Sequence, residues 1–111
     1  MTALGLREHP DAREEFLDAL DWYDDHANGL GRRLLTEFNA NLTLIRTWPE
    51  AAPRYRGRVN HPGLRAKSLR SFPYRIISFV RDAEVVVVAY AHAKRRPGYW
   101  RKRLDGLRSA A

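Results

Sequence analysis

The side chains of this 111-residue chain that are best suited to chemistry are arginines and one histidine in its second half. Arginine outnumbers lysine by 17 to 3, and a guanidinium can bind phosphate or carboxylate through two parallel hydrogen bonds. His92 opens a basic and aromatic segment that runs to Trp100, and an imidazole can exchange protons near neutral pH. These residue types suit recognition of an anion, and His92 adds a candidate acid or base.

Several other chemistries are excluded by composition and spacing. The chain has no cysteine, so thiolate catalysis, cysteine-based zinc binding and disulfide redox chemistry are excluded. No phosphate-binding glycine loop and no Ser/His/Asp signature is present. The four histidines are scattered without paired ligand spacing. The sequence therefore predicts no metal and no cofactor.

The charge of the chain is divided between its two halves. Residues 1–50 hold five Lys or Arg and ten Asp or Glu, whereas residues 51–111 hold fifteen and three. The halves thus carry net charges of −5 and +12, and the whole chain carries +7. This asymmetry predicts an anionic partner for the second half.

Two helices are expected in the acidic half to position these residues. His9-Pro10-Asp11 opens the first, because proline suits the first helical turn, and Asn28-Gly29 ends it. Its acidic stripe is interpreted as a solvated face rather than a catalytic carboxylate pair. A second helix over about 30–48 ends at Trp48-Pro49 and forms a hairpin with the first.

The remaining elements are strands and a short helix. Strands are expected over 3–8, 64–70, 74–80 and 84–90, with the last two paired antiparallel through a short turn. The apolar run of the last strand indicates burial on both faces. A short C-terminal helix is expected to start at Pro97, with Trp100, Leu104 and Leu107 on its apolar side.

The predicted fold is a single α+β domain over residues 1–111: an N-terminal strand, a helical hairpin, a three-stranded antiparallel sheet and a short C-terminal helix. The longest apolar run has seven residues, Val85 to Ala91, far below the roughly 18 that a membrane span needs. The first residues lack a signal-peptide core, so the cytoplasm is the expected compartment.

Motifs along nearly the whole chain resemble one family, the RelE/ParE superfamily of toxins from type II toxin–antitoxin modules, often labelled plasmid stabilisation proteins. The first half carries His9-Pro10-Asp11-Ala12, Trp22-Tyr23, Gly29-Leu30-Gly31 and Trp48-Pro49. The second half carries Leu69-Arg70, Phe72-Pro73-Tyr74-Arg75-Ile76, and His92, Arg95, Pro97, Tyr99 and Trp100. The last set is the most specific.

The resemblance implies one of two activities, both of which arrest growth. ParE-like toxins bind and poison DNA gyrase without a known catalytic site, whereas RelE-like toxins cleave mRNA in the ribosome without a metal. In the RelE-like case the resemblance places Arg75, His92, Arg95 and Tyr99 in catalysis. Either kind is neutralised by a cognate antitoxin in a hetero-oligomer, here expected to be acidic. The surface expected to bind target or antitoxin holds Arg70, Arg75, Arg95, Arg96 and Arg101.

The motifs favour the ParE-like activity, and one departure weakens the nuclease. RelE-like enzymes carry lysines on the strand before the Tyr-Arg pair, where this chain has Ala66 and Ser68. Lys67 is offset by one residue, which turns its side chain to the other face of a strand. The nuclease remains the alternative, and a simple nucleic-acid-binding module ranks third.

Each candidate residue also has a purely structural interpretation. His92 can be a hydrogen-bonding residue at a strand end, Arg75 can be a solvated strand residue, and Tyr99 and Trp100 can belong to the core. Arg54, Arg56 and Arg58 can belong to a solvated loop.

Overall fold

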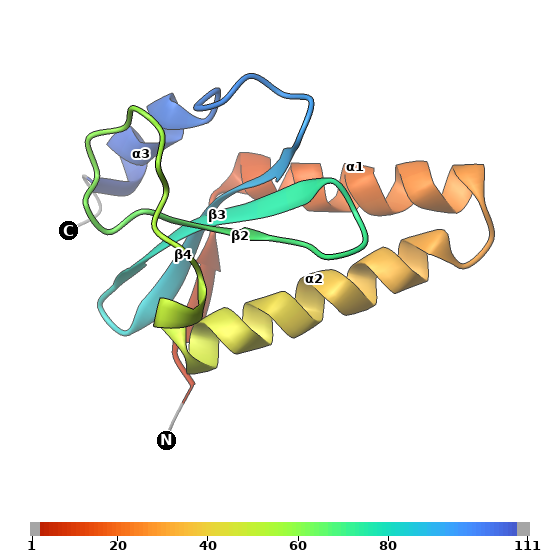
Figure 1. Cartoon of the computed structure of the whole chain (residues 1–111), viewed down its shortest axis with the longest axis horizontal. Helices are drawn as coiled ribbons and strands as arrows, with labels where there is room; N and C mark the ends of the chain where they lie inside the picture. The colour runs from red at the N-terminus through yellow and green to blue at the C-terminus, as the bar shows by residue number, and fades with distance from the viewer. Residues whose placement is uncertain (1–2, 109–111) are drawn as a thin grey trace.

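The computed structural model describes residues 3–108 and arranges them around one sheet (Figure 1). In chain order the elements are β1 (Gly5–Glu8), α1 (Pro10–His26), α2 (Leu30–Thr47), the 3-10 turn η1 (Pro49–Ala51), β2 (Arg65–Ser68), β3 (Tyr74–Arg81), β4 (Glu84–His92) and α3 (Arg101–Arg108). The α+β class, the helical hairpin and the C-terminal helix are confirmed.

The helical hairpin forms where its end signals lie. His9 caps α1, because its Nδ1 accepts a hydrogen bond from the Asp11 backbone N–H at 3.0 Å. Gly29 joins the two helices with a left-handed φ of 83°, which glycine adopts without strain. The apolar sides of both helices pack on one face of the sheet, where Phe16 and Phe38 contact each other and Tyr90.

The sheet has four strands and is mixed, not three-stranded and antiparallel as predicted. Its strand order is β1-β4-β3-β2, and β1 pairs parallel to β4 while the other pairs are antiparallel. The helical hairpin supplies the long connection that a parallel pair requires. The β4 strand lies inside the sheet and is buried from Val85 to Ala91, as its apolar run predicts.

A second core covers the other face of the sheet. There Trp100 and Leu104 pack with Ile77, Phe79 and other apolar side chains beneath the 52–64 loop. Trp100 is 1% exposed and meets the Tyr55 ring at 5.1 Å. The sheet is therefore covered by the helical hairpin on one face, and by the 52–64 loop with α3 on the other (Figure 1).

The C-terminal helix starts at Arg101, four residues later than predicted. Gly98 has a left-handed φ of 78°, which interrupts the helical path that Pro97 was expected to open. The 93–100 segment therefore crosses the end of the sheet as a series of turns before α3 begins.

Candidate functional site

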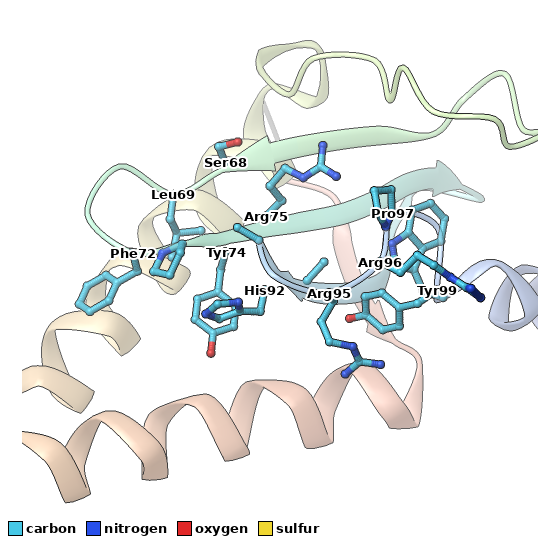
Figure 2. Close-up of a pocket in the computed structure, with 14 residues that line it drawn as sticks. Ser68, Leu69, Phe72, Tyr74, Arg75, His92, Arg95, Arg96, Pro97 and Tyr99 are labelled. Atoms are coloured by element: carbon cyan, nitrogen blue, oxygen red, sulfur yellow. The ribbon is translucent and has the colours of Figure 1, made fainter.

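Five of the predicted site residues come together at one end of the sheet. A cleft of about 340 Å³ lies where β3 starts, β4 ends and the 93–100 segment crosses the end of the sheet. Figure 2 shows the residues that line it. The residues from both predicted sets that line this cleft are Arg75, His92, Arg95, Arg96 and Tyr99.

Two predicted residues lie outside this cleft. Arg70 is exposed before β3, and its backbone N–H donates to Glu37 Oε2 at 2.5 Å. Arg101 is exposed at the first residue of α3. Neither side chain has an ion-pair partner within residues 3–108.

The cleft wraps around the strand ends, so that its residues come from both faces of the sheet. Tyr74 pairs with His92, and both side chains point toward the helical hairpin (Figure 2). Arg75 pairs with Ala91 and lies on the opposite face, over the Tyr55 ring at 5.6 Å. Arg75 and His92 are thus separated by the sheet itself.

An irregularity in β4 causes this separation. Ile77 pairs with Ala89 and Ser78 pairs with Val87, so Val88 is an extra residue in β4. Val88 and Ala89 consequently pack in the same core. Each later residue of β4 therefore lies on the face opposite to the one that regular strand alternation would give it. Continued from Val87, alternation would place His92 on the same face as Arg75.

The strand before β3 offers Arg75 no ionisable neighbour on its own face. Ser68 lies opposite Arg75, and Lys67 lies opposite Ile76, whose side chain is in the core beneath the helices. The offset of Lys67 predicted from the sequence is confirmed. Paired strand residues share a face, so serine and alanine are the strand side chains directly beside Arg75.

His92 is held by two contacts. Its ring lies 5.0 Å from the Tyr74 ring in an edge-to-face arrangement. Its Nδ1 accepts a hydrogen bond from the Lys94 backbone N–H at 3.0 Å. In the neutral imidazole the proton therefore resides on Nε2. One nitrogen of His92 thus orders the start of the 93–100 segment, and the other remains for a partner.

The Tyr99 hydroxyl is already engaged inside the protein. It donates to Glu15 Oε2 at 2.5 Å, and its ring lies 3.9 Å below the Arg95 guanidinium. Burial, reinforced by this hydrogen bond, raises the pKa of Tyr99 above its usual value. A tyrosine that holds its proton this firmly is a poor general base.

Glu15 is the central residue that the sequence interpretation missed. Its side chain is 16% exposed, and its carboxylate accepts the Tyr90 backbone N–H at 3.1 Å as well as the Tyr99 hydroxyl. Arg103 donates to both carboxylate oxygens, at 2.9 and 3.1 Å, and also to the Val88 carbonyl at 3.0 Å. Glu15 and Arg103 therefore close the edge of β4 beyond the end of β1 and anchor the 93–100 segment.

The available sequence signal for Glu15 was its position on α1. Apolar residues at Ala12, Phe16 and Ala19 define the buried stripe, and Glu15 lies beside that stripe, whereas Glu14 and Asp18 are exposed. Arg103, on α3, turns inward to pair with Glu15.

A second, adjoining cleft of about 480 Å³ lies between α1 and the 92–99 segment. Trp22 and Tyr23 from α1 face His92 and Tyr99 across it. Trp22 is 52% exposed and stacks on His26 at 3.7 Å. Together the two clefts give this end of the molecule a basic side and an aromatic side.

Within residues 3–108, no group of three or more His, Asp or Glu side chains is arranged to hold a metal ion. No helix in the same part of the chain combines the length and apolarity needed to cross a membrane.

Comparison with known proteins identifies the fold. No protein-family model and no curated protein matches the chain. A chain of the chromosomal ParDE toxin–antitoxin system from P. aeruginosa matches with a TM-score of 0.63 and 14% identity, over 83% of this chain and 98% of that one. The isolated E. coli toxin RelE matches with a TM-score of 0.61 and 22% identity, over 98% of this chain and 100% of that one.

A double arginine-to-alanine variant of E. coli RelE in the free state gives the same TM-score of 0.61 and 22% identity, over 90% of this chain and 94% of that one. These matches cover 83% to 98% of this chain, so the fold is shared over most of its length. The chain has the RelE/ParE toxin fold that its sequence motifs predicted.

Proposed function

We propose that this protein is the toxin of a type II toxin–antitoxin module and that it arrests growth by binding an essential cytoplasmic target rather than by cutting RNA. DNA gyrase is the target expected from the ParE-like motifs. A cognate antitoxin would bind the toxin in a hetero-oligomer and neutralise it. The fold shared with ParDE and RelE chains supports the toxin assignment.

The pairing register of β3 and β4 is the main observation that favours binding over RNA cleavage. RNA cleavage without a metal needs a base, an acid and cations gathered around one phosphate. Here the sheet separates Arg75 from His92, and the Tyr99 hydroxyl is already hydrogen-bonded to Glu15. The strand residues beside Arg75 are Ser68 and Ala91, which are neither acids nor bases at neutral pH. This arrangement suits an exposed binding surface.

A metal-independent, ribosome-dependent ribonuclease is the second candidate, and one observation favours it. His92 and three arginines line the same cleft, at the strand ends where both faces of the sheet are accessible. A phosphate lying across the strand ends would be within reach of both faces. The two candidates make opposite predictions for the Tyr99 hydroxyl and for His92.

The deciding experiment is induction of the protein alone in bacteria, with three separate readouts. We expect altered plasmid supercoiling and double-strand DNA breaks, without new mRNA 5′ ends. Tyr99→Phe, at wild-type abundance, should remain toxic because its hydroxyl contacts Glu15 rather than substrate. Arg75→Gln should lose toxicity, and Arg32→Gln on α2 is the matched control.

Ribosome-dependent mRNA 5′ ends that fall by roughly 10² or more in His92→Ala, the usual scale for loss of a general acid or base, would establish the nuclease instead.

A further inference from the structure

Six of the exposed cations of the second half lie in two segments that cover one face of the sheet. The 52–64 loop and the 95–102 segment pack together there through Tyr55 and Trp100, whose ring centroids are 5.1 Å apart. Both segments cover the sheet face opposite the helical hairpin (Figure 1). They carry seven exposed cations. Arg95 lies over the Tyr99 ring and points toward α1 (Figure 2), and we leave it out of the set. The other six, which we call the basic face, are Arg54, Arg56, Arg58, Arg96, Arg101 and Lys102.

These cations are not compensated within the protein. Among residues 3–108, the ion pairs of the structure engage Arg7, His9, Arg13 and Arg103, and none engages the basic face. Residues 51–111 contain only three acidic residues, and one of them, Glu84, is paired with Arg7. The positive field of this face is therefore available to an external anion.

The acidic side chains lie in the other layer. Exposed carboxylates of α1, on the outer side of the helical hairpin, include Glu14, Asp18, Asp21 and Asp25. Because the hairpin and the basic face cover opposite faces of the sheet, the acidic side chains of α1 and the cations of the basic face lie on opposite sides of the molecule. A long polyanion would therefore be attracted to the basic face and repelled by the acidic side of α1.

The positions of the exposed apolar side chains indicate whether the basic face suits a nucleic acid or a protein. Protein interfaces have an apolar or aromatic centre, whereas interfaces with DNA are polar and strongly positive. Of the large hydrophobic side chains exposed within residues 3–108, five lie on the helical hairpin or at its end and one, Val80, lies on β3. None lies in the 52–64 loop or the 93–107 segment.

From these observations we infer that the basic face binds the phosphate backbone of duplex DNA without reading its bases. Trp100 is buried in the core, and Tyr55 is partly buried between the Trp100 ring and the Arg75 guanidinium, so neither ring is free to stack on bases. The inference extends the proposed function, since a gyrase-bound toxin would lie close to duplex DNA. The partner chemistry is the phosphodiester backbone, and the contacts are arginine–phosphate pairs.

The test measures binding of the purified full chain to a fluorescent duplex of about 20 base pairs over a range of salt concentrations. Each phosphate contact contributes about −0.9 to the slope of log K against log salt. We expect a slope of about −5 for the six cations, the same for unrelated sequences. Poly-glutamate at equal charge concentration should compete weakly.

A matched pair of double variants locates the surface. Arg56→Gln with Arg58→Gln should reduce the magnitude of the slope by about 2, whereas Arg32→Gln with Arg33→Gln, on α2, should leave it unchanged. Both pairs remove the same charge from exposed positions. An equal reduction of the slope in the two double variants would show that binding depends only on net charge, and would overturn the inference.

Two other outcomes also overturn it. Absence of DNA binding at low salt would do so, and tighter binding of poly-glutamate than of DNA would assign the face to an acidic protein. Toxicity is measured separately in cells, so a toxin that fails to bind DNA would leave the proposed function intact.

Discussion

Two carboxylates flanking the start of α1 form matching networks at the residue scale. Each accepts a tyrosine hydroxyl at 2.5 Å and pairs with an arginine, and both are largely buried. Only one network reaches the candidate site, because Tyr99 belongs to the crossing segment and stacks on Arg95. The two sets are Glu8 with Tyr90 and Arg13, and Glu15 with Tyr99 and Arg103.

Substitution of Glu8 and of Glu15 in separate variants distinguishes a contribution to stability from a role in positioning the 93–100 segment. Glu8→Gln and Glu15→Gln should each lower the free energy of unfolding by about 1–3 kcal/mol, since each weakens charge-assisted hydrogen bonds. Only Glu15→Gln should speed hydrogen exchange of the 93–100 amides, because Glu15 contacts Tyr99 in that segment and Glu8 does not. Urea denaturation and hydrogen exchange measure these effects.

The same exchange rates in both variants would show that Glu15 stabilises the fold without positioning the crossing segment.

At the scale of elements, α3 and the crossing segment depend on the core beneath them. The α3 helix has eight residues, and a helix this short is marginal in isolation. Trp100, at its start, and Leu104, within it, are almost fully buried against the sheet. This docking holds Arg101 and Lys102 on the basic face.

Two tryptophans provide a direct comparison of buried and exposed rings. Trp100→Ala should lower the free energy of unfolding by about 3–5 kcal/mol, because it empties a filled core position. Trp48→Ala, at a side chain that is 53% exposed after α2, should cost less than about 1 kcal/mol. Urea denaturation followed by far-ultraviolet circular dichroism measures both. Similar losses for the two would contradict the assignment of Trp100 to the core.

At the scale of the whole molecule, the Tyr90 and Tyr99 hydroxyls should make the free energy of unfolding depend on pH. Burial is the largest cause that raises the pKa of Tyr90 and of Tyr99, and hydrogen bonds to Glu8 and Glu15 act in the same direction. The folded protein therefore retains these protons at pH values where the unfolded chain loses them. Their contribution is complete below the unfolded pKa of about 10 and is lost as the pH rises above it.

We expect the free energy of unfolding to fall above about pH 10, by up to about 1.4 kcal/mol per pH unit for each tyrosine. The double variant Tyr90→Phe with Tyr99→Phe should lose less stability between about pH 8 and about pH 11. Chemical denaturation across this range measures the difference. A double variant whose curve runs parallel to that of the wild type would exclude these hydroxyls as the source.

Most elements, and much of their burial, can be predicted from local sequence patterns. Local signals placed the helical hairpin, because His9-Pro10 and Asn28-Gly29 act on neighbouring backbone alone. Burial of β4 and of Trp100 followed from apolar runs and helical spacing. Five of the residues that the motifs indicated line one cleft, because all five belong to β3, to β4 or to the segment that follows it.

The faces that these residues occupy depend on long-range packing, which local sequence patterns do not specify. The parallel place of β1 beside β4 is a pairing between distant segments, so no local signal specifies it. The extra residue at Val88 lies in a run that is apolar on both faces, where alternation cannot fix the register. Packing on the two cores sets it instead, and thereby turns His92 away from Arg75. The Glu15–Tyr99 contact likewise joins residues 84 positions apart, through a fold that brings α1 against the end of β4.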